Sequence, residues 1–145
     1  MARILAIDYG RKRTGLAVTD DLQIIATGLT TVPSSDTIAF LSAYLSGEKV
    51  ERFIVGLPRQ MNNSPSESVL VIESFIRSLE KAFPQIPVER MDERFTSKIA
   101  FQTMVSAGLK RKDRQNKALV DQVSATIILQ SYLEARNNIH QRSKP

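Results

Sequence analysis

Carboxylates end two strand-like segments of this chain, and paired carboxylates can hold a metal ion. Asp8 directly follows the apolar run Ile4–Ile7, and Asp92 and Glu93 follow the segment 86–91. A buried strand rarely ends in a carboxylate that lacks a partner, because an unpaired buried charge is costly. A metal ion is one such partner. The alternatives are turn capping for Asp8, an exposed strand end for Asp92, and an ion pair or a helix start for Glu93.

Asp121, in the last helical segment, offers a third carboxylate. Its spacing places it on the same helix face as the small residues Ser124 and Ala125. Small residues allow that face to approach a sheet closely, and an aspartate at its rim is costly if buried alone. A solvated aspartate near the helix N-terminus, which the helix dipole favours, is the alternative.

Converging carboxylates repel one another and raise one another's pKa, and a divalent cation removes this repulsion. The chain has no cysteine and one histidine, His140, which excludes thiolate and histidine-rich metal sites and disfavours nucleophilic catalysis with histidine as the base. Oxygen ligands favour Mg²⁺ or Mn²⁺. Two such ions about 4 Å apart can hold the attacking water and the leaving oxygen of a phosphodiester.

Basic residues gather beside the candidate carboxylates. Three of them follow Asp8, and five precede Asp121 with only Asp113 opposing them; they are Arg11, Lys12 and Arg13, then Lys110, Arg111, Lys112, Arg114 and Lys117. The net charge is +5, and such clusters favour a polyanion and bind phosphate backbones. A solvated loop is the alternative for the second cluster.

The residue pattern predicts nine elements in the order βββαβαβαα. Alternation and apolar runs indicate the strands, and apolar stripes with Ser, Pro and Gly at their ends indicate the helices. The predicted strands span 3–9, 14–20, 23–32, 50–55 and 86–91, and the predicted helices span 34–46, 66–83, 96 or 97 to 108, and 115–136.

This order predicts an α/β fold with a mixed five-stranded sheet and helices on both faces. The first three strands form an antiparallel meander, and strands separated by helices pair in parallel through right-handed crossovers. Ligands in such sheets bind beyond the carboxyl ends of the parallel strands, where Asp8 and the Asp92–Glu93 pair are placed. If those two strands are neighbours, their carboxylates lie together.

Composition predicts one soluble domain over residues 1–138, followed by a polar, flexible tail at 139–145. Apolar residues make up 42% of the chain and charged residues 24%. No apolar run approaches the roughly 18 residues of a membrane span, and the N-terminus does not resemble a signal peptide. We therefore expect a cytoplasmic protein without a membrane partner.

Four motifs in the right order make the chain resemble the YqgF family, also called RuvX. Its members are described as Holliday junction resolvases or as nucleases for the 5′ end of the small-subunit ribosomal RNA precursor. The motifs are Ile7-Asp8-Tyr9-Gly10 with Arg13, Gly15, Ala17 and Asp20; Val55-Gly56-Leu57-Pro58 with Met61; Asp92-Glu93-Arg94 with Thr96-Ser97; and Asp121-Gln122 with Ala125, Ile128-Leu129-Gln130 and Tyr132-Leu133.

The resemblance implies the ribonuclease H-like fold and a metal-dependent phosphodiesterase. In this family pattern Asp8 bridges two metal ions, and Glu93 and Asp121 each complete one site, with Asp92 as the alternative to Glu93. Water bound to metal is then the nucleophile. The residues that would hold phosphates are Arg13, Arg59 and Arg94.

The implied partner is structured RNA or branched DNA. Resolution of a symmetric four-way junction needs two active sites, and hence a dimer, whereas trimming of ribosomal RNA needs only a monomer. We therefore expect a monomer or a weak homodimer.

The loop after the second motif departs from the family pattern. Family members usually carry a glycine near position 63, where this chain has Met61-Asn62-Asn63-Ser64-Pro65. Asparagine tolerates a left-handed backbone, and Pro65 stiffens the loop. The departure bears on the loop's substrate contacts rather than on the metal site.

Two other functions compete with a nuclease. Actin-like and sugar-kinase-like ATP binders begin with a similar Asp-x-Gly hairpin, but they need two such domains and this chain has one hairpin of that kind. A ribonuclease H-like module that binds nucleic acid or a partner without cleaving it is the second alternative. The presence of all three acids argues against it, and an Asp8→Asn variant separates the two.

Overall fold

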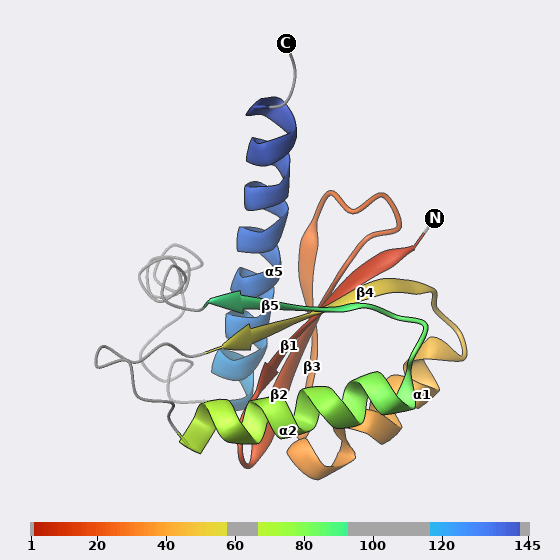
Figure 1. The fold of residues 1–145 in the computed structure, drawn as a ribbon, viewed down its shortest axis with the longest axis vertical. Coiled ribbons are helices and arrows are strands. Elements are labelled where there is room, and N and C mark those ends of the chain that lie inside the picture. The colour runs from red at the N-terminus through yellow and green to blue at the C-terminus, as the bar shows by residue number, and fades with distance from the viewer. Residues whose placement is uncertain (1, 58–66, 93–116, 143–145) are drawn as a thin grey trace.

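The computed structural model describes residues 2–57, 67–92 and 117–142 (Figure 1). The predicted helix from 96 or 97 to 108 lies outside these residues, and every other predicted element is present. The elements are β1 (Arg3–Tyr9), β2 (Arg13–Thr19), β3 (Ala26–Pro33), the 3₁₀ turn η1 (Ser34–Asp36), α1 (Thr37–Leu45), β4 (Val50–Leu57), α2 (Glu67–Ala82), β5 (Val88–Asp92) and α5 (Lys117–Arg142).

The strands form one five-stranded sheet in the order β3-β2-β1-β4-β5. β1 pairs antiparallel with β2, and β2 pairs antiparallel with β3. β4 is parallel to both β1 and β5. This is the predicted mixed sheet, with an antiparallel meander followed by parallel strands.

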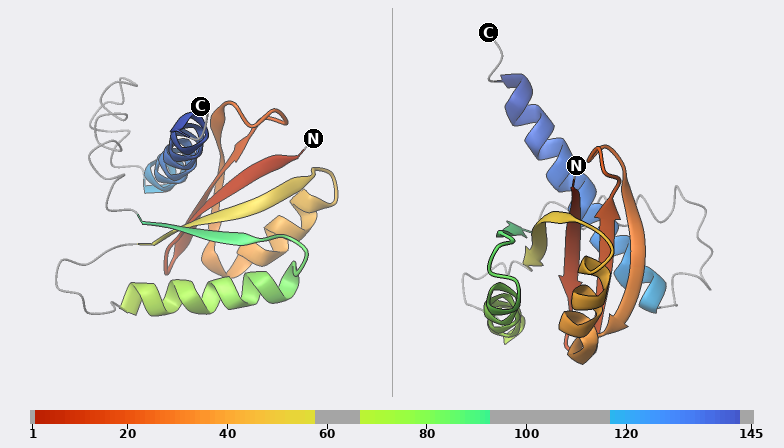
Figure 2. Two further views of the ribbon diagram at one scale, coloured as in Figure 1. Left: turned by 45° about the horizontal axis from the view of Figure 1, so that its top comes forward. Right: turned by 90° about the vertical axis from the view of Figure 1, so that its right-hand side faces the viewer.

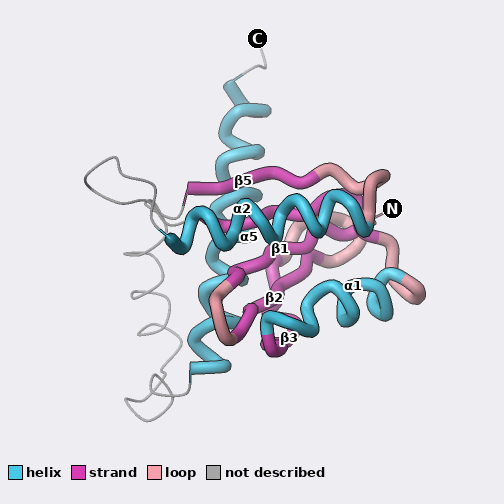
Figure 3. Tube along the Cα trace, turned by 60° about the horizontal axis from the view of Figure 1, so that its bottom comes forward, coloured by secondary structure: helices cyan, strands magenta, loops and turns pink. Residues whose placement is uncertain are grey.

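Helices cover both faces of the sheet, as predicted. α1 and α2 lie on one face and α5 crosses the other, over β1, β2 and β3 (Figures 2 and 3). The central strand β1 is therefore buried on both sides, with Ile4 and Ala6 facing α5 and Leu5 and Ile7 facing α1 and α2. Its continuous apolar sequence reflects this position, because a strand covered on both faces has no solvent side.

The apolar stripe of α2 matches its predicted period with one change. Ile72, Ile76 and Leu79 are buried against the sheet as predicted, but Phe75 is buried with them while Val69 is half-buried. On α1, Leu41 is fully buried in the same core, and Ile38 and Leu45 pack against it.

The third strand begins later than predicted, at Ala26 rather than at residue 23. The Asp20 carboxylate accepts hydrogen bonds from the backbone N–H groups of Leu22, Ile24 and Ile25, at 3.2, 2.8 and 2.8 Å. These bonds fold residues 20–25 into a turn, in which Gln23 has a φ of 59°. Ile24 and Ile25 are therefore 67% and 63% exposed rather than part of a strand.

Other boundaries shift by a few residues. Residues 34–36 form the 3₁₀ turn η1 before α1, where one continuous helix was predicted, and β5 begins at Val88 rather than at residue 86. α5 extends to Arg142, past the predicted end at 136, so the first four residues of the predicted tail are helical. Within the residues that the structure describes, no helix combines the length and apolar character needed to cross a membrane.

Candidate active site

Asp8 stands at the carboxyl end of the central strand β1, on the face covered by α5. Strand alternation from the buried residues Ile4 and Ala6, which contact the α5 core, assigns it to that face. Its side chain is half-buried. The apolar run before it fixes this position, because Ile4 and Ala6 cannot change face without exposing the core.

Glycines flank Asp8 in both neighbouring strands. Gly15 of β2 pairs with Asp8, and Gly56 of β4 follows Val55, the partner of Ile7. Side chains of adjacent strands on one face normally lie about 5 Å apart and fill the space between them. Neither glycine supplies such a side chain, and both glycines are themselves buried. The glycines of the first two family motifs are the sequence signal for this arrangement around Asp8.

β4 separates β1 from β5, so the condition that these two strands are neighbours is not met. Neighbouring strands lie about 4.8 Å apart, which places the ends of β1 and β5 about 10 Å apart across β4. All three strands run parallel, and their carboxyl ends reach the same edge of the sheet. The predicted carboxylate positions therefore share one edge but not adjacent strands.

Asp121 lies in the first turns of α5, where the structure describes the backbone. The same helix face carries Ala125 and Ile128, which are buried against the sheet. Figures 1 and 2 place this N-terminal end of α5 on the side where β1, β4 and β5 end. The Gln122 side chain packs on β3, where a Cβ added to Gly28 would lie 2.5 Å from Gln122 Nε2.

The predicted basic turn joins β1 to β2 at the same edge. Gly10 N–H donates to the Arg13 carbonyl at 3.0 Å, and a Cβ added to Gly10 would lie 2.6 Å from that oxygen. Only glycine allows so close an approach. Arg11 and Lys12 are exposed and Arg13 is half-buried, so the turn presents cations beside the strand that ends in Asp8.

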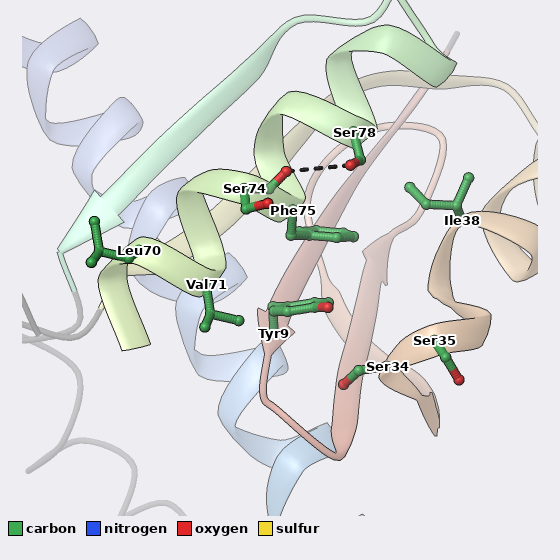
Figure 4. Close-up of a pocket in the computed structure, with 9 residues that line it drawn as sticks. All are labelled: Tyr9, Ser34, Ser35, Ile38, Leu70, Val71, Ser74, Phe75 and Ser78. Carbon is green, nitrogen blue, oxygen red and sulfur yellow. Dashed lines mark hydrogen bonds between the residues drawn. The ribbon is translucent and has the colours of Figure 1, made fainter. Parts of the chain in front are cut away.

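Tyr9, the neighbour of Asp8, points to the opposite face of the sheet and packs there. Its ring stacks on Phe75 with centroids 4.1 Å apart (Figure 4). The pair lines a pocket of about 500 Å³ between η1, α1 and α2, together with Ser34, Ser74 and Ser78. Tyr9 therefore packs against the core on the side of the sheet away from Asp8.

The remaining predicted site residues cannot be placed beside Asp8. Six of them lie outside the described residues; they are Arg59, Glu93, Arg94, Lys110, Arg111 and Lys112. Asp92 is the last residue of β5 and pairs with Leu57. The structure thus places the basic turn directly after the end of β1, and the end of β5 at the same edge of the sheet.

The sheet order, the helices on both faces and the aspartate at the end of the central strand define the ribonuclease H-like class of fold. Thermus thermophilus RuvC in complex with a Holliday junction substrate has this fold. It matches the chain with a TM-score of 0.58 and 18% identity, covering 94% of this chain and 96% of that one. A second Thermus thermophilus RuvC structure matches with a TM-score of 0.54.

Sequence comparison shows the family. The RuvX family model, described as Holliday junction resolvase, matches residues 2–135. A Bacteroides thetaiotaomicron protein named "Putative pre-16S rRNA nuclease" is 64% identical over 136 residues, which cover 94% of this chain and 99% of the relative. A Flavobacterium psychrophilum relative of the same name is 61% identical over 133 residues, with coverage of 92% and 97%. The chain belongs to the RuvX family, and its class is that of nucleases that hydrolyse phosphodiester bonds.

Proposed function

We propose that this chain is a divalent-metal-dependent nuclease acting on structured nucleic acid, with its active site around Asp8. The position of Asp8 carries the proposal. It is a half-buried carboxylate at the carboxyl end of the central strand, between two glycines and next to a basic turn. The cations of the turn favour an anionic ligand beside this carboxylate.

The residues fit a hard divalent cation. The chain offers carboxylate oxygens at this edge, has no cysteine, and has its one histidine at position 140. Such oxygen donors suit Mg²⁺ or Mn²⁺. The proposed ligands are Asp8, Glu93 and Asp121. A bound divalent cation would supply Lewis-acid polarisation of the phosphodiester and a water nucleophile at neutral pH.

Glu93 is the proposed ligand that follows β5, with Asp92 as the alternative. Glu89 bonds to Arg52, which contacts Tyr132 of α5, and Met91 packs against the α5 core. Val88 and Arg90 face the other way, toward the α2 side. β5 thus presents Glu89 and Met91 to the α5 face of the sheet, which also carries Asp8.

In this proposal the basic residues hold the substrate rather than perform chemistry. Arg11, Lys12 and Arg13 would neutralise phosphates next to the scissile bond, and Arg59, Arg94 and the 110–112 cluster would extend this surface. Contacts of this kind fix the position of a nucleic acid without reading its sequence. Asp8 would orient the reacting phosphate through the bound cation.

The substrate that the comparisons favour is the ribosomal RNA precursor. Relatives more than 60% identical over nearly the full chain carry the name pre-16S rRNA nuclease, while the family description refers to Holliday junctions. We therefore propose processing of the 5′ end of pre-16S RNA by a cytoplasmic monomer or weak homodimer, with branched DNA as the second substrate.

The test is a side-by-side cleavage assay. End-labelled pre-16S RNA and a labelled four-way DNA junction are incubated with the chain and with Asp8→Asn, with Mg²⁺, with Mn²⁺ or with EDTA. We expect metal-dependent cleavage that EDTA and Asp8→Asn both abolish, with the faster substrate identifying the polymer. Binding of either substrate without cleavage by the wild-type chain would contradict the proposal and favour a binding module.

A further inference from the structure

Ser34 ties the basic turn to a distant part of the chain. It lies at the start of η1, 24 residues from Gly10, and is only 7% exposed. Its hydroxyl donates to the Gly10 carbonyl at 2.5 Å, and its backbone N–H donates to the Lys12 carbonyl at 3.0 Å. The buried Thr14 hydroxyl lies 2.9 Å from the Ser34 hydroxyl and completes the cluster.

The turn depends on these bonds because it lies beyond the strand ladder. Pairing between β1 and β2 ends at Tyr9 and Thr14, and Arg13 is held by its pairing with Pro33. Residues 10–12 lie outside both ladders. Ser34 supplies donors to the first and the last of these three residues, so one side chain and its backbone fix the segment that carries Arg11 and Lys12.

Removal of the Ser34 hydroxyl would take this partner from one half-buried and one buried oxygen atom. The Gly10 carbonyl would lose a donor, and the Thr14 hydroxyl, on a fully buried residue, would lose its neighbour. Unsatisfied buried polar groups are unfavourable, so the turn would shift to reach water or another donor. A shift of this kind moves the exposed cations relative to Asp8.

We propose that Ser34 is a positioning residue that holds the Gly10–Arg13 turn in the shape that binds substrate phosphate. This inference rests on the proposed nuclease function. Ser34 acts through the turn and does not itself contact the reacting atoms. Ser34 reaches the turn because the residue before it, Pro33, pairs with Arg13, and its side chain also lines the pocket beside Tyr9 (Figure 4).

The first test compares Ser34→Ala with wild type on the cleaved substrate. We expect KM, and the Kd measured in Ca²⁺, to rise roughly 2- to 10-fold, the effect of one lost hydrogen bond, with kcat near wild type. The slope of log Kd against log salt should become shallower, because fewer phosphates are neutralised. Ser34→Thr keeps the hydroxyl, so it should restore wild-type values.

A matched control separates positioning from a general loss of stability. Ser46→Ala removes an exposed hydroxyl that donates to the Ala43 carbonyl at 2.6 Å, at the C-terminal end of α1, and should change neither KM nor the salt slope. If Ser34→Ala does not fold, Thr14→Val removes the other hydroxyl of the cluster and should raise KM by a smaller factor.

The outcomes distinguish this inference from the proposed function. A wild-type chain that cleaves, together with a folded Ser34→Ala or Thr14→Val variant of unchanged KM and salt slope, would overturn the inference alone. A lower melting temperature with unchanged KM would also overturn it, since the hydroxyl would then be only structural. A wild-type chain that cleaves neither polymer would overturn the proposed function itself.

Discussion

The two turns of the β1–β2–β3 meander are built by the same physics and differ in what they present. Residues 10–13 join β1 to β2 and are held by Ser34, and residues 20–25 join β2 to β3 and are held by the Asp20 carboxylate. The first turn carries three cations next to Asp8, and the second exposes Leu22, Ile24 and Ile25. Hydrogen-bonded capping is therefore common to both turns, and the positive charge at the carboxyl edge is what distinguishes the turn proposed to bind substrate.

Position in the sheet explains the difference. The first turn lies where β1 ends, at the edge shared with the ends of β4 and β5, and the second lies at the opposite edge, near Arg3 and Ala2. There Gln23 donates to the Ala2 carbonyl at 2.9 Å and accepts from Arg136 of α5 at 2.7 Å. The second turn thus contacts the projecting part of α5, whereas in the proposed function the first turn faces the substrate.

The largest expected effect comes from removal of charge at the first turn. The triple variant Arg11→Gln, Lys12→Gln, Arg13→Gln should bind nucleic acid much more weakly at physiological salt. Each phosphate contact contributes about 0.7 to 0.9 to the slope of log Kd against log salt, so we expect the slope to fall by about 2 to 3. Filter binding in Ca²⁺ across a salt series measures this. An unchanged slope would remove the first turn from the substrate surface.

The second largest effect is expected from a substitution that changes the shape of the first turn and leaves its charge unchanged. Gly10→Ala forces a Cβ to within 2.6 Å of the Arg13 carbonyl, so the turn must move. We expect a loss of stability of about 1 to 3 kcal/mol and weaker substrate binding. Urea denaturation and binding assays check both. Gly47→Ala is the control, because nothing lies within 4 Å of its added Cβ, and it should be close to neutral.

The second turn should matter for stability in a pH-dependent way. Hydrogen bonds from the Ile25 and Ile24 backbone N–H groups hold the pKa of Asp20 below its ordinary value of 3.8. A lowered folded-state pKa stabilises the fold above the unfolded pKa, and this contribution is lost as pH falls through the folded pKa. Wild type should therefore exceed Asp20→Asn in stability at neutral pH, and the difference should shrink below about pH 4. Thermal melts across pH measure it, and a constant difference would contradict the assignment.

The smallest effect is expected at the apolar side chains of the second turn. Leu22→Ser, Ile24→Ser and Ile25→Ser remove exposed groups, and exposed substitutions usually change stability by less than about 0.5 kcal/mol each. Cleavage rates should be unchanged. A large drop in cleavage would contradict the difference between the two turns, because it would show that the second turn also takes part in function.

Sequence patterns predicted the sheet and its helices well because the burial of each element leaves its own pattern of apolar residues. The two-sided burial of β1 gave a continuous apolar run, and the stripe on α2 gave its helical period. The start of β3 was wrong, because Ile24 and Ile25 have strand-forming side chains while Asp20 captures their N–H groups. Strand propensity alone could not reveal that the Asp20 carboxylate binds the N–H groups that a longer β3 would have used.

Within the candidate site, the type of residue was predictable and the arrangement was not. The end of an apolar strand identified Asp8, but only the ladder registers reveal Gly15 and Gly56 on either side of it. Ser34 was interpreted as the start of a helix, whereas its hydroxyl serves a turn 24 residues earlier. The order of the elements along the chain also does not determine the order of the strands in the sheet, in which β4 lies between β1 and β5.

The most direct test of the central claim is Mn²⁺ binding, measured by electron paramagnetic resonance on wild type, Asp8→Asn and Asp20→Asn. These two variants change one carboxylate in each of the two compared regions. The account predicts that wild type and Asp20→Asn bind Mn²⁺ alike and that Asp8→Asn binds at least about tenfold more weakly while keeping its fold. Equal binding by a folded Asp8→Asn variant would contradict the placement of the active site at the carboxyl end of β1.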